Sequence, residues 1–178
     1  AAKESGFCEE IFENHDEKPT SSFLYSLVMD TYSLNGYHSA PFLDMPLNHK
    51  VFLAQFDTIK KIAERESCVI VGRCADYALS DNPDCINIFI HADMDKRVKI
   101  ISQRANITEN KARDLIQKQD KQRASYYNYY TSKKWGDAAS YNLSLDSGVL
   151  GIDGCVQMIK KAIEIKEERL AKNNREVK

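Results

Sequence analysis

Apolar residues recur at helical spacing in four segments of the chain. The first segment follows a possible N-cap at Asn48 and is marked by Phe52, Phe56, Ile59 and Ala63. Two further helices are expected over residues 93–104 and from Thr108 to about residue 123 or beyond. The last helix carries the stripe Ile152, Val156, Ile159 and Ile163. Each segment therefore has one face suited to packing against a core.

Short, continuous apolar runs lie between these helices. Residues 68–72 and 86–90 are rich in β-branched side chains, as expected of strands buried on both faces, and residues 141–145 form a weaker third run. Strands that alternate with helices indicate a parallel sheet with right-handed crossovers. The pattern therefore predicts an α/β fold in three layers, with helices on both faces of a parallel sheet.

The N-terminal quarter of the chain has a different pattern. Residues 1–13 read as helical but lack a start signal, and residues 14–47 are irregular and rich in turn residues and aromatic rings. Long irregular segments in compact domains are commonly functional or mobile. Three strands are few for so much helix, and we therefore expect the natural polypeptide to have more sheet upstream of Ala1.

Composition narrows the class of protein. The chain has 178 residues, 43% hydrophobic and 29% charged, and its 25 basic and 26 acidic residues nearly cancel. These values fit one soluble domain and exclude nucleic-acid binding driven by overall charge. No stretch is long and apolar enough to span a membrane. The five cysteines form no C-x-x-C pair and the four histidines match no metal spacing, so we expect a cytoplasmic protein without a side-chain metal site.

Phosphate chemistry has one candidate motif in the printed sequence. No G-x-x-x-x-G-K-[ST] or G-x-G-x-x-G motif occurs, but Gly72 and Arg73 directly follow an expected strand. Ligands of open α/β sheets bind beyond the carboxyl ends of strands, where the planar guanidinium of Arg73 would suit a phosphate and Asp76 could orient it. The alternative is an ordinary surface ion pair.

The predicted helices carry further charged candidates. The stripe of Ala112, Leu115, Ile116 and Gln119 continues into Asp120 and Arg123, which share a face and could enter a cleft. Arg97 and Arg104 lie seven residues apart and could reach a phosphate near a strand end. For both pairs the alternative is a set of solvated helix charges.

A tyrosine-rich block follows, formed by Tyr126, Tyr127, Tyr129, Tyr130 and the single tryptophan Trp135. Residues 117–137 hold five basic and two acidic side chains. Rings interleaved with positive charge suit stacking on bases and binding of phosphates. The alternative is a hydrophobic latch that packs this segment on the core.

The runs SCVIVGRCADYAL, INIFIHADMDKRVK and DKQRASYYNYYTSKKWGDAASYNLSLDS resemble the cytidylate kinase-like family, a branch of the phosphate-loop nucleoside monophosphate kinases. The resemblance covers nearly the whole chain. It implies a five-stranded parallel sheet of the P-loop NTPase kinase type whose first two strands and phosphate loop would begin on the order of 30 residues before Ala1. It also implies one domain over residues 1–178, with a monophosphate-binding insertion at 14–47 and a lid and post-lid region at 94–137.

The resemblance also implies roles for individual residues. The acceptor monophosphate would be bound by Arg73 with Asp76, and the pyrimidine nucleotide by Asp120 and Arg123. A further substrate contact is expected at Tyr127, and the insertion at 14–47 offers Tyr37, Asp16 and Lys18 as weaker candidates. Arg97 would begin the lid and, with Arg123, neutralise charge in the transition state. The phosphate donor would be contacted by Arg104, Asp146 and Ser147.

The function implied is ATP-dependent phosphoryl transfer to a nucleoside monophosphate or a related small acceptor. The cofactors would be ATP and Mg²⁺, bound mainly by a segment outside this chain, because the phosphate-loop lysine and its Ser/Thr are absent from the sequence. Two alternatives stay open: a catalytically inactive nucleotide-binding protein, and a module that binds single-stranded nucleic acid. The sequence does not identify the acceptor or the oligomeric state.

Overall fold

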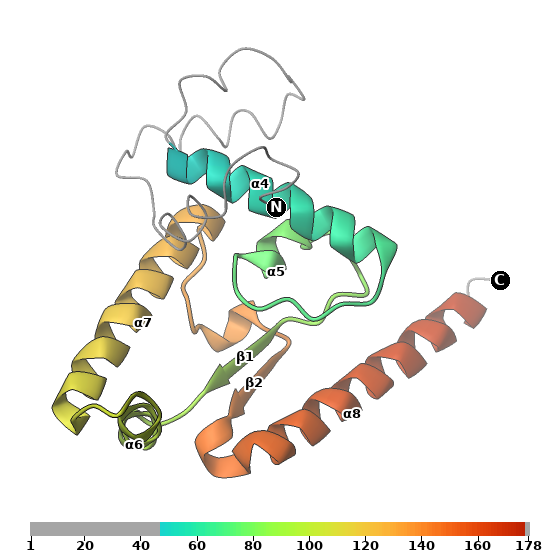
Figure 1. Cartoon of the computed structure of the whole chain (residues 1–178). Coiled ribbons are helices and arrows are strands. Elements are labelled where there is room, and N and C mark those ends of the chain that lie inside the picture. The colour runs from blue at the N-terminus through green and yellow to red at the C-terminus, as the bar shows by residue number, and fades with distance from the viewer. Residues whose placement is uncertain (1–46, 177–178) are drawn as a thin grey trace. The chain divides into compact units, whose positions relative to one another are not determined.

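A computed structural model describes residues 47–176, which are mostly helical and contain a small parallel sheet (Figure 1). The elements are, in chain order, α4 (Leu47–Arg65), α5 (Ala75–Ala78), β1 (Ile88–His91), α6 (Met94–Ala105), α7 (Glu109–Thr131), the 3₁₀ turn η2 (Ala138–Ser140), β2 (Leu143–Asp146) and α8 (Ser147–Glu176). The four expected helices and two of the three expected strands are thereby confirmed. No helix in the described part of the chain is long and apolar enough to cross a membrane.

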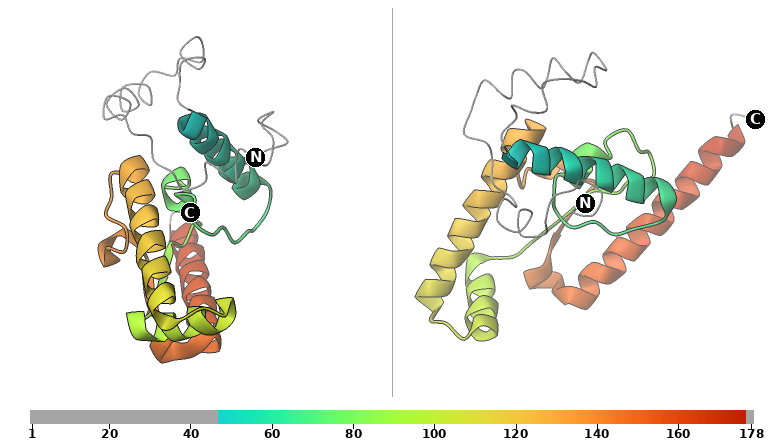
Figure 2. Two further views of the ribbon diagram at one scale, coloured as in Figure 1. Left: turned by 60° about the vertical axis from the view of Figure 1, so that its left-hand side comes forward. Right: turned by 45° about the horizontal axis from the view of Figure 1, so that its top comes forward.

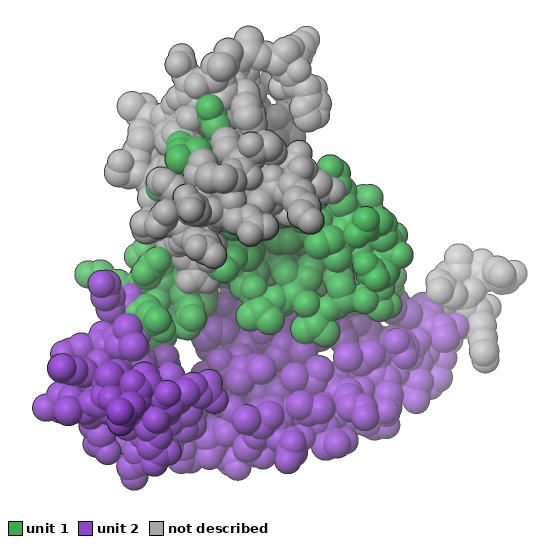
Figure 3. All heavy atoms as spheres, viewed as in Figure 1, with its two compact units in different colours: residues 1–85, 119–135 green, residues 86–118, 136–178 purple. Residues whose placement is uncertain are grey.

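The chain divides into two compact units (Figure 3). Unit 1 contains residues 1–85 and 119–135, and unit 2 contains residues 86–118 and 136–178. Helix α7 contributes its N-terminal part to unit 2 and its C-terminal part to unit 1. Each unit is therefore built from segments that are distant in sequence.

The core of unit 1 is aromatic. Phe52 of α4 stacks on Tyr130 of α7, with ring centroids 3.9 Å apart and the ring planes within 8° of parallel. The same cluster buries Cys74, Tyr126 and Tyr127, and partly buried neighbours pack around it: Leu53, Phe56, Tyr129 and Trp135. The tyrosine block is thus a latch that packs the end of α7 on α4, one of the two roles considered for it.

Unit 2 contains the sheet. Strands β1 and β2 pair in parallel, with Ile88 opposite Leu143 and His91 opposite Asp146. Helix α8 contacts both strands, runs back from the end of β2 and continues past them (Figures 1 and 2). The parallel pairing confirms the expected strand–helix–strand arrangement, because parallel neighbours need a long crossover between them.

A second apolar cluster joins α6 to the beginning of α7 within unit 2. Val98, Ala112 and Ile116 are buried there, each at most 3% exposed. Thr108 directly precedes α7 and caps it, since its carbonyl accepts the Ala112 amide at 2.9 Å. Arg113 donates to Asp95 at 2.7 Å on the exposed side of the two helices. The predicted stripe along α7 is thus confirmed at Ala112 and Ile116, whereas Leu115 is exposed.

The expectation of a buried strand over residues 68–72 is wrong for this structure. The segment has no regular secondary structure, and Val69 and Val71 are 95% and 86% exposed. A strand exists only when its amides and carbonyls pair with a neighbour, and within residues 47–176 the only paired strands are β1 and β2. β-branched composition alone cannot supply that partner.

The apolar stripe of α8 is also less buried than its spacing suggests. Ile152, Val156 and Ile163 are 77%, 46% and 39% exposed, whereas Cys155 is 3% exposed. Gly151 has φ 68° and interrupts the helical backbone near the start of α8. The residues expected to form the N-terminal helix and the irregular segment, up to residue 46, lie outside the described part of the chain.

Truncating the stacked phenylalanine tests the aromatic core. Phe52→Ala is expected to lower the free energy of unfolding by about 3–5 kcal/mol, because it removes a buried ring and leaves a cavity beside Tyr130. Urea unfolding followed by tyrosine and tryptophan fluorescence measures this loss. Val69→Ala is the control and should change stability by less than about 0.5 kcal/mol. A loss below about 1 kcal/mol for Phe52→Ala would contradict the packing described here.

Acidification tests the burial of His49 at the start of α4. This side chain is 2% exposed and lies against the rings of Phe52 and Tyr130, and burial lowers its pKa below the usual 6.5. The unfolded chain therefore takes up a proton below pH 6.5 that the folded chain resists. Stability should fall as pH decreases from 6.5, by at most about 1.4 kcal/mol per pH unit. Unfolding measured at pH 7.5 and 5.5 should show a smaller drop in stability for His49→Phe than for the unsubstituted protein.

Candidate functional site

Arg73 occupies the middle of an unusual turn in unit 1. Gly72, Arg73 and Cys74 all have left-handed backbones, with φ of 71°, 59° and 52°. Glycine adopts this conformation freely, whereas each L-residue with a side chain does so at a cost of about 1–2 kcal/mol. Burial of Cys74, which is 4% exposed in the aromatic core, offsets part of that cost. The turn thus places Arg73 at the entrance of α5.

The turn leads directly into the short helix α5. The Ala75 amide donates to the Gly72 carbonyl at 3.2 Å, and the amides of Tyr77 and Ala78 donate to the Cys74 carbonyl at 3.0 Å. Asp76 lies in the first turn of this helix. Arg73 and Asp76 therefore belong to one local structure, as the sequence spacing suggests.

Asp76 is tied to the end of α7. Its Oδ2 accepts a hydrogen bond from the Tyr127 hydroxyl at 2.6 Å and lies 3.5 Å from Nζ of Lys133. The Asp76 side chain is only 11% exposed. Hydrogen bonds to a carboxylate are among the stronger ones in proteins, so this pair of contacts fixes α5 against α7.

The chain reversal after α7 brings Lys133 to Asp76. The Thr131 hydroxyl donates to the Tyr127 carbonyl at 2.7 Å and accepts the Lys133 amide at 3.1 Å. Ser132 has φ 56°, so the chain leaves the helix through a left-handed residue. The Trp135 amide then donates to Oδ1 of Asn128 at 2.7 Å. Lys133 is one of the basic residues of the tyrosine-rich block, but nothing local in the sequence indicates its pairing with Asp76.

Asp120 and Arg123 lie on the part of α7 that belongs to unit 1. They are half-buried and exposed, respectively. Their spacing continues the helix face of Ile116, and the same face reaches Tyr127. Two charged residues thus interrupt a face that is buried on either side, which is a position suited to contacting a polar ligand.

The expected donor-side residues lie in unit 2. Asp146 ends β2 and Ser147 begins α8, while Arg97 and Arg104 lie at the two ends of α6. The Ser147 hydroxyl donates to the His91 carbonyl at 2.9 Å, and Oδ1 of Asp146 accepts the Gly148 amide at 2.8 Å. Both residues therefore help to close the carboxyl end of the two-stranded sheet, where ligands of α/β folds bind.

Gly148 brings the backbone close to α6. Lys96 Nζ donates to the Gly148 carbonyl at 2.7 Å, and a Cβ on Gly148 would lie 2.7 Å from Cδ of Lys96. No local sequence signal indicates this contact between Lys96 and Gly148. Tyr37, Asp16 and Lys18 lie outside the described part of the chain.

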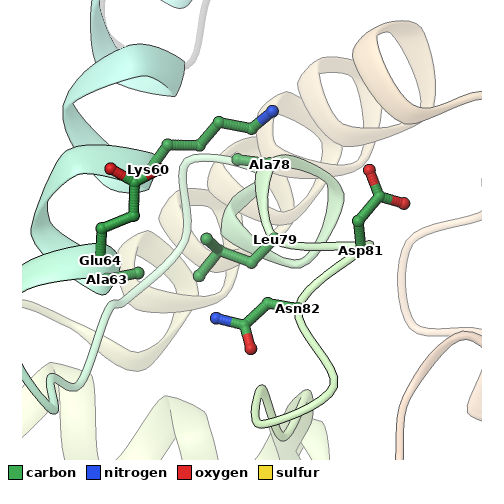
Figure 4. Close-up of a pocket in the computed structure, with 7 residues that line it drawn as sticks. All are labelled: Lys60, Ala63, Glu64, Ala78, Leu79, Asp81 and Asn82. Carbon is green, nitrogen blue, oxygen red and sulfur yellow. The ribbon is translucent and has the colours of Figure 1, made fainter.

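A hollow of about 230 Å³ lies beside α4 and α5 (Figure 4). It is smaller than the roughly 300–1,000 Å³ of typical small-molecule pockets, and none of the residues expected at the site lines it. Its lining is Lys60, Ala63, Glu64, Ala78, Leu79, Asp81 and Asn82. No function is assigned to it. Residues 47–176 also contain no cluster of three or more His, Cys, Asp or Glu side chains that could hold a metal ion.

Two substitutions at Arg73 test the strain in the turn. Both Arg73→Gly and Arg73→Ala remove the guanidinium, but only glycine relieves the left-handed backbone. Arg73→Gly should therefore be the more stable variant, by about 1 kcal/mol, after allowance for the greater freedom of glycine in the unfolded chain. Thermal unfolding compares the two, and equal stabilities would contradict a left-handed backbone at this position.

Comparisons with known proteins agree with this architecture. A crystal structure of an uncharacterized protein from Eubacterium ventriosum is similar to the chain, with 39% sequence identity and a TM-score of 0.63. The match covers 66% of this chain and 74% of that one. None of the curated proteins compared with the chain matches it.

The family model described as the cytidylate kinase-like family matches residues 1–149. The match includes the Arg73 turn, α6, α7 and β2, and thus all residues expected at the site. This confirms the resemblance inferred from the sequence. The chain belongs to the cytidylate kinase-like family.

Proposed function

We propose that this protein is a nucleotide kinase that transfers the γ-phosphoryl group of ATP to a nucleoside monophosphate or a related small acceptor. The observation that carries the proposal is the family match over residues 1–149, which includes an arginine in a strained turn. Backbone strain is often retained at ligand sites, where surrounding contacts over-determine an unfavourable conformation.

Arg73 is the proposed ligand of the acceptor phosphate. Its guanidinium presents donors in a planar fork that matches two phosphate oxygens. An oxygen of the acceptor phosphate would attack the γ-phosphorus of ATP in line, the bond to the β-phosphate oxygen would break, and ADP would leave. Arg97 and Arg123 are proposed to neutralise charge in that transition state.

The proposed roles divide between the two units. The acceptor-side residues Arg73, Asp76, Asp120, Arg123 and Tyr127 belong to unit 1. The donor-side residues belong to unit 2, as does the proposed lid residue Arg97; they are Arg104, Asp146 and Ser147. Kinases of this chemistry close around their substrates before transfer, and the acceptor-side and donor-side residues are proposed as two separate subsites. We propose one kinase-like domain over residues 1–178, with a monophosphate-binding insertion at 14–47 and a lid and post-lid region at 94–137.

The donor is proposed to be ATP accompanied by Mg²⁺. The described residues offer no cluster of ligands for a metal ion, so no residue of this part of the chain is assigned to Mg²⁺. The sequence also contains no phosphate-loop motif. We therefore propose that a segment outside the printed sequence supplies most of the contacts to ATP and to its metal ion.

The same proposal extends to the sheet. Ile90 of β1 is 53% exposed, which is unusual for a β-branched residue in a strand. Further strands beside β1 would bury Ile90 and complete a three-layer fold of the P-loop NTPase type. Exposed apolar strand edges are otherwise prone to association.

Two other functions are less well supported. A catalytically inactive nucleotide-binding protein would retain Arg73 without turnover, and the absence of a phosphate-loop motif in the printed sequence is the observation in its favour. A module for single-stranded nucleic acid would need exposed rings for stacking on bases. Tyr126, Tyr127 and Tyr130 are instead at most 9% exposed, which argues against such a module.

The proposal is tested by ATP consumption with a panel of nucleoside monophosphates, using the full-length protein. At least one monophosphate should be phosphorylated. Arg73→Ala should weaken its binding about 10- to 100-fold, which corresponds to the loss of one charge-assisted hydrogen bond. Arg65→Ala removes an exposed arginine from the end of α4 and should change nothing.

The outcomes separate the candidate functions. Monophosphate binding without turnover would favour the inactive binding protein. Affinity for single-stranded nucleic acid that falls steeply with salt, without affinity for monophosphates, would favour the nucleic-acid-binding module. Neither binding nor turnover with any monophosphate would overturn the proposed acceptor class.

A further inference from the structure

We propose that Asp76, held by Tyr127 and Lys133, is a positioning residue that locks the turn of Gly72, Arg73 and Cys74 and thereby directs Arg73 toward the acceptor phosphate. The role of Arg73 in this inference rests on the proposed function. The locking of the turn does not, and it can be measured without any nucleotide.

The turn needs support from outside its own sequence. It contains two consecutive left-handed residues that are not glycine, and such a conformation persists only where surrounding contacts determine it. The helix that follows has only four residues, too few to be stable by its own hydrogen bonds. Tertiary contacts must therefore hold Arg73 in place.

Two side chains near the start of α5, those of Cys74 and Asp76, contact α7 and hold the short helix in place. The side chain of Cys74 is buried beside Phe52 and the tyrosines of α7. Two residues further on, Asp76 receives the Tyr127 hydroxyl at 2.6 Å and the Lys133 ammonium at 3.5 Å. Tyr127 is 51 positions away in sequence, so the hydrogen bond joins two separate parts of the chain. Neither Cys74 nor Asp76 can move without losing contacts to α7.

Lys133 is held in a defined place rather than free on the surface. The Thr131 hydroxyl accepts the Lys133 amide, and Thr131 is itself 6% exposed. The Lys133 side chain is 38% exposed, whereas the next residue, Lys134, is exposed and forms no ion pair in the described structure. Lys134 is therefore a matched control for the charge of Lys133.

The chemistry of Asp76 argues for positioning rather than substrate contact. A carboxylate accepts hydrogen bonds and cannot donate one to a phosphate oxygen. Its charge would also repel a phosphate, whereas the charge of Arg73 attracts one. Asp76 already engages a hydroxyl and an ammonium group of its own chain. Its effect on an acceptor phosphate would therefore pass through Arg73.

Thiol protection measures the locking of the turn directly. The protein is treated with iodoacetamide under native conditions, and tandem mass spectrometry quantifies each cysteine. Cys74 should label slowly in the wild type because it is 4% exposed. Lys133→Met, Tyr127→Phe and Asp76→Asn should each speed its labelling about tenfold, the factor expected for loss of one charge-assisted contact. Lys134→Met should not, and Lys133→Arg should restore protection.

Two other cysteines serve as internal references in the same samples. Cys68 is exposed and should label at one rate in every variant. Cys155 is buried in α8 of unit 2 and reports unfolding elsewhere in the chain. Faster labelling of Cys74 together with Cys155 would show general loss of structure and would overturn the specific role of Asp76. Unchanged labelling of Cys74 in Lys133→Met and Asp76→Asn would overturn it as well.

A double-substitution cycle then tests the link to Arg73, with cytidine monophosphate as the probe in titration calorimetry on the full-length protein. Asp76→Asn should weaken binding about tenfold in the wild type and have no further effect in Arg73→Ala. An equal effect in both backgrounds would show that Asp76 acts independently of Arg73. If the wild type binds no monophosphate while Cys74 protection follows the expected pattern, the proposed function fails and the locking of the turn stands.

Discussion

The packing of the end of α7 against α4 is the interaction on which the described part of unit 1 depends. Phe52 and Tyr130 stack face to face, and Tyr126, Tyr127 and Cys74 complete the buried cluster. Aromatic side chains bury large areas and favour particular ring geometries, so they determine how two helices meet more strictly than aliphatic residues do. Because Cys74 belongs to this cluster, the same packing also determines where the Arg73 turn lies.

This arrangement relates the stability of unit 1 to its proposed chemistry. Tyr127 has its ring in the core and its hydroxyl on Asp76, so one side chain serves both packing and the polar contact. Asp120 and Arg123 lie on the preceding turns of the same helix. The strained turn at Arg73 and the charged pair Asp120 and Arg123 are thus both next to elements that pack in the aromatic core. Preorganised donors of this kind are what phosphoryl transfer requires from a protein.

Much of the described fold could be predicted because it follows from local periodicity. The boundaries of α4 and α6 agree with expectation to within about two residues, and the parallel pairing of β1 with β2 follows from the long crossover between them. The expectation for residues 68–72 failed because a strand is a pairwise structure, and its partner is not among the described residues. The apolar stripe of α8 is also more exposed than expected, because spacing shows which residues could be buried but not what covers them.

The sequence by itself determined the helices, the two parallel strands and the family, since each depends on residues close together in the chain or on a motif. It also singled out Arg73 as the candidate phosphate ligand. Only the tertiary structure decided that Tyr127 and Lys133 meet at Asp76, that Gly72, Arg73 and Cys74 are all left-handed, and that three tyrosines of the block are buried. The physical reason is that these features depend on contacts between segments fifty or more residues apart. Such contacts depend on how helices pack, which no local pattern specifies.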